Sequence, residues 1–209
     1  FKGDQVDWRT ESTARVWATG YDFPAVKDKR VRLDMYEEDY RSAGLMVGFI
    51  YNLNRDKFKD PRVRQALNYA LPFEEMNKAL FYGQYERMDS YFDGIPLAAS
   101  GLPEGRELEL LTEIKDQVPP EVFTEVYKNP VNKGPTEQRN SLRQALKLLT
   151  EAGYELKDNK LLDKNGKELE VEFLMNGPLY EKIALRYQAE LAKIGIKFDI
   201  RPVDTAQYE

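Results

Sequence analysis

The feature that most constrains this chain is a strand–helix–strand pattern near its C-terminal end. Apolar and polar side chains alternate over residues 169–175, which indicates a strand, and again over residues 196–200. Between them, apolar residues follow helical spacing over residues 183–191 and stop before Gly195. This order predicts a βαβ unit, in which the two strands lie parallel and are joined by a right-handed crossover.

Three further helices and a hairpin are expected upstream. Asp60 and Pro61 offer an N-cap and a first helical residue for a helix whose buried face is Val63, Ala66, Leu67 and Ala70. Pro72 ends it, and a second short helix follows over residues 73–80. A longer helix is expected from a cap at Thr136 to Gly153. Next comes a hairpin with its tip at residues 164–167, where Asn-Gly favours a type I′ turn.

The rest of the chain has weaker patterns of secondary structure. The apolar run from Leu45 to Leu53 is suited to a buried strand, and a second strand is expected near residues 31–35. Short helices are expected near residues 12–17 and 108–114. The remainder of residues 83–135 reads as ordered loops, because Gly and Pro are frequent there.

Composition excludes several classes of protein. The chain of 209 residues has 31 basic and 36 acidic residues, a net charge of −5. This charge disfavours binding to nucleic acid and to an anionic membrane surface. The chain contains no cysteine and no histidine, so disulfides, thiolate metal sites and serine–histidine triads cannot form within it. We therefore expect no nucleic-acid partner, no metal and no cofactor.

Catalytic patterns are weak, and one aromatic cluster stands out. The carboxylate pairs Glu37-Glu38 and Glu74-Glu75 join adjacent residues, which do not face each other on a helix or strand. Aromatic residues gather at Phe81–Tyr85 and at Tyr91-Phe92, beside Gly83. Two interpretations remain open for this cluster: loop residues packing on the core, or the lining of a ligand cleft.

Several segments resemble one family. The run Tyr51–Leu67 is similar to a segment of the family 5 extracellular solute-binding proteins, in which a strand ending in Asn leads through Phe and Asp into a helix beginning VRQAL. Segments that resemble the branch serving the Yej-type importer of oligopeptides and microcin C follow in the same order along the chain: residues 17–24, 80–92, 100–105, 151–154 and 203–208.

The resemblance implies an α/β fold: one lobe of a class II periplasmic binding protein, with a mixed sheet, packed helices and the C-terminal βαβ unit. Residues 1–45 would be a tail segment of the first ligand-binding lobe, and residues 46–209 the second lobe, incomplete at its C-terminus. The chain would be a fragment, because family members have an additional N-terminal part and continue after Tyr208. It would belong to a monomeric periplasmic component of an ABC importer that binds peptides, contacts the permease subunits and is not an enzyme.

Five residues are expected to bind ligand, and none to be catalytic. Asn176 and Tyr180 follow the first strand of the βαβ unit, where ligands of open α/β sheets gather. Gly48 and Ile50 would share the cleft-facing side of strand 45–53, with Phe49 and Tyr51 on the other side. Tyr91 would belong to an aromatic cleft wall. Two alternatives stay open: a hydrolase or transferase that uses carboxylates alone, and a periplasmic adaptor without a small ligand.

Overall fold

The computed structural model describes residues 2–3, 5–36, 46–178 and 180–208. Contacts divide the chain into a first unit, residues 1–34, 51–85 and 131–209, and a second unit, residues 35–50 and 86–130. The lobe boundary expected after residue 45 falls at the end of the range 37–45, which lies outside the described residues, so it stays a prediction.

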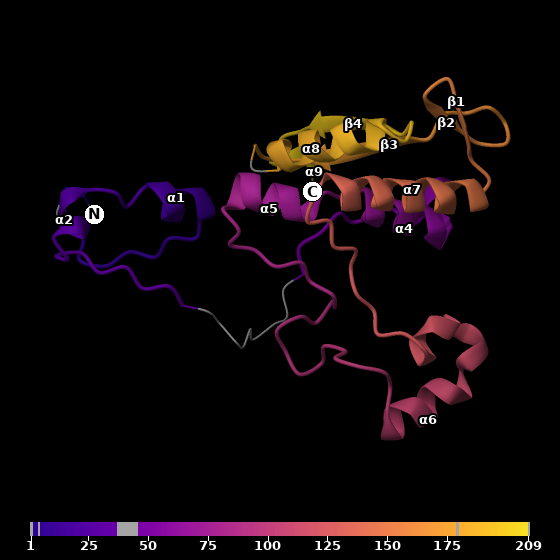
Figure 1. The fold of residues 1–209 in the computed structure, drawn as a ribbon, viewed down its shortest axis with the longest axis horizontal. Coiled ribbons are helices and arrows are strands. Elements are labelled where there is room, and N and C mark those ends of the chain that lie inside the picture. Colours follow the sequence, from indigo (N-terminus) through magenta and orange to yellow (C-terminus); the bar gives the residue numbers. More distant parts are fainter. Residues whose placement is uncertain (1, 4, 37–45, 179, 209) are drawn as a thin grey trace. The chain divides into compact units, whose positions relative to one another are not determined.

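Most of the regular structure belongs to the first unit (Figure 1). Its elements are α1 (Ala14–Thr19), α2 (Pro24–Lys27), α3 (Asp56–Lys59), α4 (Pro61–Ala70), α5 (Phe73–Phe81), α7 (Pro135–Glu151), β1 (Glu155–Lys157), β2 (Lys160–Leu162), β3 (Glu170–Met175), α8 (Glu181–Ala192), β4 (Lys197–Pro202) and α9 (Thr205–Tyr208). The second unit contains α6 (Gly105–Glu113) and the 3-10 turns η1 (Lys115–Gln117) and η2 (Pro120–Phe123).

Helix α4 forms as its sequence predicts. The Asp60 side chain accepts a hydrogen bond from the Arg62 backbone N–H at 2.9 Å, and Pro61 occupies the first helical position. The expected apolar face of α4 is buried, and α7 runs beside it. Leu149 of α7 is fully buried. These two helices supply much of the core of the first unit because their apolar stripes face each other.

The βαβ unit is confirmed. Strands β3 and β4 are parallel neighbours, with Val171 opposite Phe198, and α8 connects them. Period-2 alternation gives the sheet one apolar face. On that face the rings of Tyr187 in α8 and Phe198 lie 5.4 Å apart between centroids. Helix α8 therefore covers the apolar side of the sheet.

The opposite face of this sheet is charged. Lys197 forms ion pairs with Glu170 at 3.0 Å and with Asp199 at 3.3 Å. Arg201 pairs with Glu172 across the strands at 3.6 Å. All of these side chains are about half exposed, so each pair contributes little to stability. They fix the solvent side of the sheet, because shifting either strand by one residue would bury them.

Both strands expected upstream are wrong over the described residues. Residues 31–36 and 46–53 form no strand, while Leu45 lies outside the described residues. Ile50 is 84 % exposed, so the apolar run is not buried. A strand requires a hydrogen-bonding partner, and none of the described strands pairs with either segment. Tyr51, near the end of this run, does contact a helix: its ring lies 5.2 Å from that of Phe58 in α3.

Two local details of the sequence prediction are also wrong. Helix α7 begins at Pro135 after Gly134, not from a cap at Thr136, because proline is already shaped for the first helical position. The β1–β2 hairpin closes at Asp158 and Asn159, both of which have positive φ. The second hairpin, with its expected tip at residues 164–167, is confirmed: Leu162 and Glu168 bridge in antiparallel fashion, and the Asp163 N–H donates to the Lys167 carbonyl at 2.8 Å. Its turn is not type I′, since only the glycine of the Asn165-Gly166 pair has positive φ.

We expect the Asp60 cap to make stability depend on pH. Hydrogen bonds from the Arg62 side chain hold the pKa of Asp60 below its ordinary value, although burial opposes this. A depressed folded-state pKa stabilises the fold above about pH 4, and this contribution is lost as pH falls through the folded pKa. Asp60→Ala should therefore cost about 0.5–2 kcal/mol at pH 7 and less at pH 3, measured by urea unfolding. Asp60→Asn, which keeps an acceptor, is the control; an equal cost of Asp60→Ala at both pH values would contradict this.

Candidate functional site

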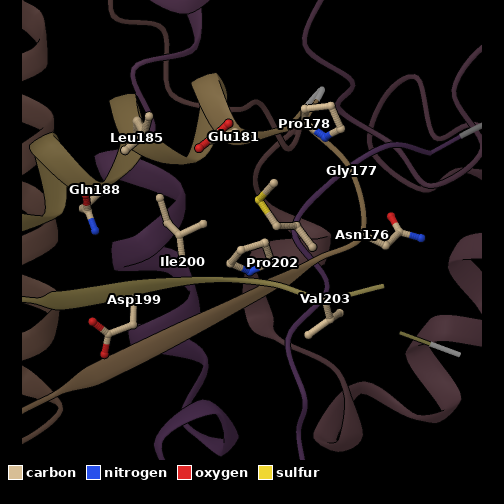
Figure 2. Close-up of a pocket in the computed structure, with 11 residues that line it drawn as sticks. Asn176, Gly177, Pro178, Glu181, Leu185, Gln188, Asp199, Ile200, Pro202 and Val203 are labelled. Atoms are coloured by element: carbon tan, nitrogen blue, oxygen red, sulfur yellow. The ribbon is translucent and has the colours of Figure 1, made fainter. Parts of the chain in front are cut away.

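An open pocket of about 720 Å³ lies where β3 and β4 end and α8 begins (Figure 2). The turn Asn176-Gly177-Pro178, directly after β3, lines one end of the pocket. Its lining residues come from three elements and the segments that follow them: Met175, Asn176, Gly177, Pro178, Glu181, Leu185, Gln188, Asp199, Ile200, Pro202 and Val203. The pocket therefore occupies the position at which open α/β sheets bind ligands.

Helix α8 contributes one wall through a single stripe of side chains. Glu181, Leu185 and Gln188 follow spacings of four and three residues, so they lie above one another on one helix face. Gln188 also fixes this wall to the sheet, because its Nε2 donates to the Phe198 carbonyl at 2.5 Å. In Figure 2, Leu185 and Ile200 lie on facing sides of the pocket, which makes its middle apolar.

Strand β4 contributes the other wall and leaves an unpaired edge. The Lys197 N–H donates to the Leu169 carbonyl, just before β3, at 3.1 Å, and the Val203 N–H donates to the Met175 carbonyl at 2.8 Å. In a parallel ladder the alternate residues then direct their N–H and C=O groups away from β3, and Ile200 is one of them. Within the described part of the chain, no strand pairs with this outer side. The backbone of Ile200 is thus available to an extended ligand.

The ionisable side chains that line the pocket are both acidic. Asp199 is partly neutralised by Lys197 at 3.3 Å. Glu181, in the first turn of α8, pairs with no cation among the residues that the structure describes. Because no lysine or arginine lines the pocket, its potential favours neutral or cationic ligand groups over carboxylates.

The structure places the five predicted ligand residues in different settings. Asn176 lines the pocket, and Tyr180 immediately precedes α8, 40 % exposed but outside the lining. Gly48, Ile50 and Tyr91 belong to the second unit, where Tyr91 is 73 % exposed. These five assignments remain predictions.

Sequence reasoning missed most of the lining. Glu181, Leu185 and Gln188 could have been found, since their spacing on a predicted helix beside the strand end marks one face. No sequence pattern indicates that Asp199 and Ile200 line the pocket, because their position depends on which edge of β4 lacks a neighbouring strand.

Neither a metal centre nor a membrane span is found in the ranges that the structure describes. There, no three acidic, histidine or cysteine side chains are grouped as metal ligands. Every helix in these ranges is too short or too polar to cross a bilayer.

Residues 1–209 match the family described as bacterial extracellular solute-binding proteins, family 5 Middle. This match assigns the βαβ unit and its pocket to the class of solute-binding proteins. The chain belongs to the family 5 bacterial extracellular solute-binding proteins.

Individual relatives support the same family assignment. The chain is 52 % identical over 209 residues to the probable peptide-binding protein YejA of Agrobacterium fabrum, covering 100 % of this chain and 34 % of that one. It is 35 % identical to the peptidoglycan-binding protein YepA of the same organism, covering 100 % and 33 %. The chain thus spans about a third of the length of these relatives.

A solved structure supports the fold. The oligopeptide-binding protein AppA of Bacillus subtilis, in complex with a nonapeptide, superposes with a TM-score of 0.52 at 24 % identity, covering 76 % of this chain and 26 % of that one. This confirms the expected α/β fold of a periplasmic binding protein.

Two tyrosines close together in sequence should differ in their effect on stability. Tyr187 is 2 % exposed, and its hydroxyl donates to the Leu67 carbonyl at 2.7 Å, so Tyr187→Ala should cost about 3–5 kcal/mol. Tyr180 is 40 % exposed, and Tyr180→Ala should leave the free energy of unfolding within about 0.5 kcal/mol of wild type. Urea unfolding compares the two variants; similar losses would mean that the region around Tyr180 is packed in the intact protein.

Proposed function

We propose that this chain is part of the substrate-binding component of an ABC importer, which captures oligopeptides or peptide-like solutes and passes them to the permease. The family and the name of the 52 % identical relative support this class. The observation that carries it is the unpaired edge of β4 along an open pocket. An extended peptide can add to such an edge through its main chain while a pocket takes a side chain.

The pocket suggests how a peptide would bind. Its backbone N–H and C=O groups would pair with those of Ile200, independently of sequence. One side chain would enter between Leu185 and Ile200, where the lining is apolar. Glu181 would then favour a lysine or arginine side chain, or a free amino terminus, over an acidic residue.

Binding would be completed by closure of two lobes. Ligand contacts in the closed state shift the equilibrium towards it, and no bond is broken, so the protein would have no catalytic activity. Gly48, Ile50, Tyr91, Asn176 and Tyr180 are proposed as ligand contacts in that state. We place the protein in the periplasm as a monomer, consistent with an extracellular solute-binding family.

The charge preference gives a direct test. Calorimetric titrations of the full-length protein should compare three peptides that differ only in a lysine, glutamine or glutamate at one position. Glu181→Gln should reduce the preference for lysine over glutamate about fivefold, the value of a roughly 1 kcal/mol exposed charge interaction. Glutamine-peptide affinity should stay within about twofold.

Glu155→Gln serves as the matched control, because Glu155 is an exposed carboxylate of β1 outside the pocket. An unchanged preference in Glu181→Gln would remove this residue from the ligand site. Absence of peptide binding by the wild-type protein at millimolar concentrations would overturn the proposed function and favour an adaptor.

The 209-residue chain alone should fold but bind peptide poorly. Ligands of closed sites lose about 70–90 % of their surface to the protein, and one wall supplies about half of that contact. A loss of about 4 kcal/mol would weaken binding about a thousandfold. Parallel titrations of this chain, with folding checked by circular dichroism, and of the full-length protein measure the difference. Equal affinities would place the whole site within residues 1–209.

A further inference from the structure

The turn after β3 contains a side chain that is prone to spontaneous chemical change. Asparagine is a thermolabile residue. It reacts most readily when glycine follows, because no side chain then shields the backbone nitrogen that attacks the asparagine amide. The sequence contains two such pairs, Asn165-Gly166 and Asn176-Gly177. Both asparagines are exposed, so exposure alone does not separate them and their local hydrogen bonds decide.

The turn at Asn165 is held by hydrogen bonds. The Gly166 N–H donates to the Asp163 carbonyl at 2.9 Å, and the Asn165 N–H donates to the Asp163 carboxylate at 2.8 Å. The Gly166 nitrogen must lose its proton before it can attack the neighbouring amide, and a hydrogen-bonded proton is harder to remove. These bonds therefore protect Asn165 from this reaction.

The turn at Asn176 lacks such bonds to the residues that the structure describes. Within those residues, neither the Gly177 N–H nor the Asn176 side chain has a hydrogen-bond partner. Pro178 favours an extended conformation of Gly177, which keeps the Gly177 N–H out of a helical turn. No atom lies within 4 Å of the position that a Cβ of Gly177 would take. The Asn176 amide can therefore rotate towards the Gly177 nitrogen.

We propose that Asn176 is a deamidation site and that its conversion changes the charge of the pocket. The Gly177 nitrogen, after losing its proton to solvent, bonds to the side-chain carbonyl carbon of Asn176. The bond from this carbon to the amide nitrogen breaks, and the amide nitrogen takes a proton from solvent and leaves as ammonia. The five-membered succinimide that results adds water at one of its two carbonyl carbons and opens to aspartate or isoaspartate. Water is the only other reactant.

Either product places a new carboxylate at the pocket. Asn176 lines the pocket together with Glu181 and Asp199, so deamidation would leave three acidic residues there. A third carboxylate would strengthen the preference for a lysine or arginine side chain in a ligand. This consequence rests on the proposed function, whereas the modification itself does not. Isoaspartate would also add one carbon to the main chain before Pro178.

Ageing of the full-length protein at mildly alkaline pH tests the modification. Peptide mapping by mass spectrometry measures the fraction of Asn176 and of Asn165 that has been converted, in the folded protein and in protein unfolded by urea. Relative to its rate in urea, Asn176 should deamidate about fivefold faster than Asn165, a factor that corresponds to one hydrogen bond of about 1 kcal/mol. Equal relative rates at the two asparagines would overturn the inference.

Binding measurements test the consequence for the pocket. Asn176→Asp reproduces one product and should raise the preference for the lysine peptide over the glutamate peptide about fivefold, measured by calorimetry. Asn165→Asp changes the net charge equally but lies outside the pocket, so it should leave this preference within about twofold. An unchanged preference in Asn176→Asp would overturn the effect on the pocket. Failure of the wild-type protein to bind any peptide would refute the proposed function, while the deamidation rates would still decide whether Asn176 is modified.

Discussion

The side chain of Tyr187 connects the two layers of the first unit, the helix α4 and the β3–β4 sheet. Its hydroxyl bonds to the Leu67 carbonyl in α4, and its ring packs on Phe198 in β4, so one residue of α8 ties a helix layer to the sheet. A second tie runs through Gln138 of α7, whose amide donates to the Ala70 carbonyl and to the Glu190 carboxylate, both at 3.1 Å. Buried polar groups are costly unless bonded, so these bonds allow few other arrangements of the helices.

Local signals explain which parts of the fold could be predicted. The Asp60-Pro61 helix start, the α8 stripe and the alternation of β3 and β4 each depend on residues within a few positions of one another, and all three are confirmed. The run at residues 46–53 failed because a strand depends on distant residues that supply its hydrogen bonds. The hairpin with its tip at residues 164–167 formed where it was expected. Its turn type was wrong because the side chain of Asp163 shapes this turn by accepting the N–H groups of Asn165 and Lys167.

In the candidate site, too, features set by neighbouring residues could be predicted and features set by distant residues could not. Asn176 could be placed at a ligand-binding position because the end of a predicted strand is readable from sequence. The acidic character of the pocket could not be predicted, because it arises when the fold brings Glu181 and Asp199, which are 18 positions apart in the chain, to one opening. Family membership gives the class of protein, while these two side chains set the charge of this one pocket.

The outer edge of β4 has a consequence for solubility. An open edge accepts any extended chain, including the same strand of another molecule, and repeated pairing of this kind builds fibres. Here the Phe198 carbonyl is already occupied by Gln188, and Pro202 has no N–H to donate. Among the residues that the structure describes, Ile200 is left as the residue on this side of β4 whose N–H and C=O groups both have no strand partner. Such a short stretch gives a growing fibre too few hydrogen bonds to propagate.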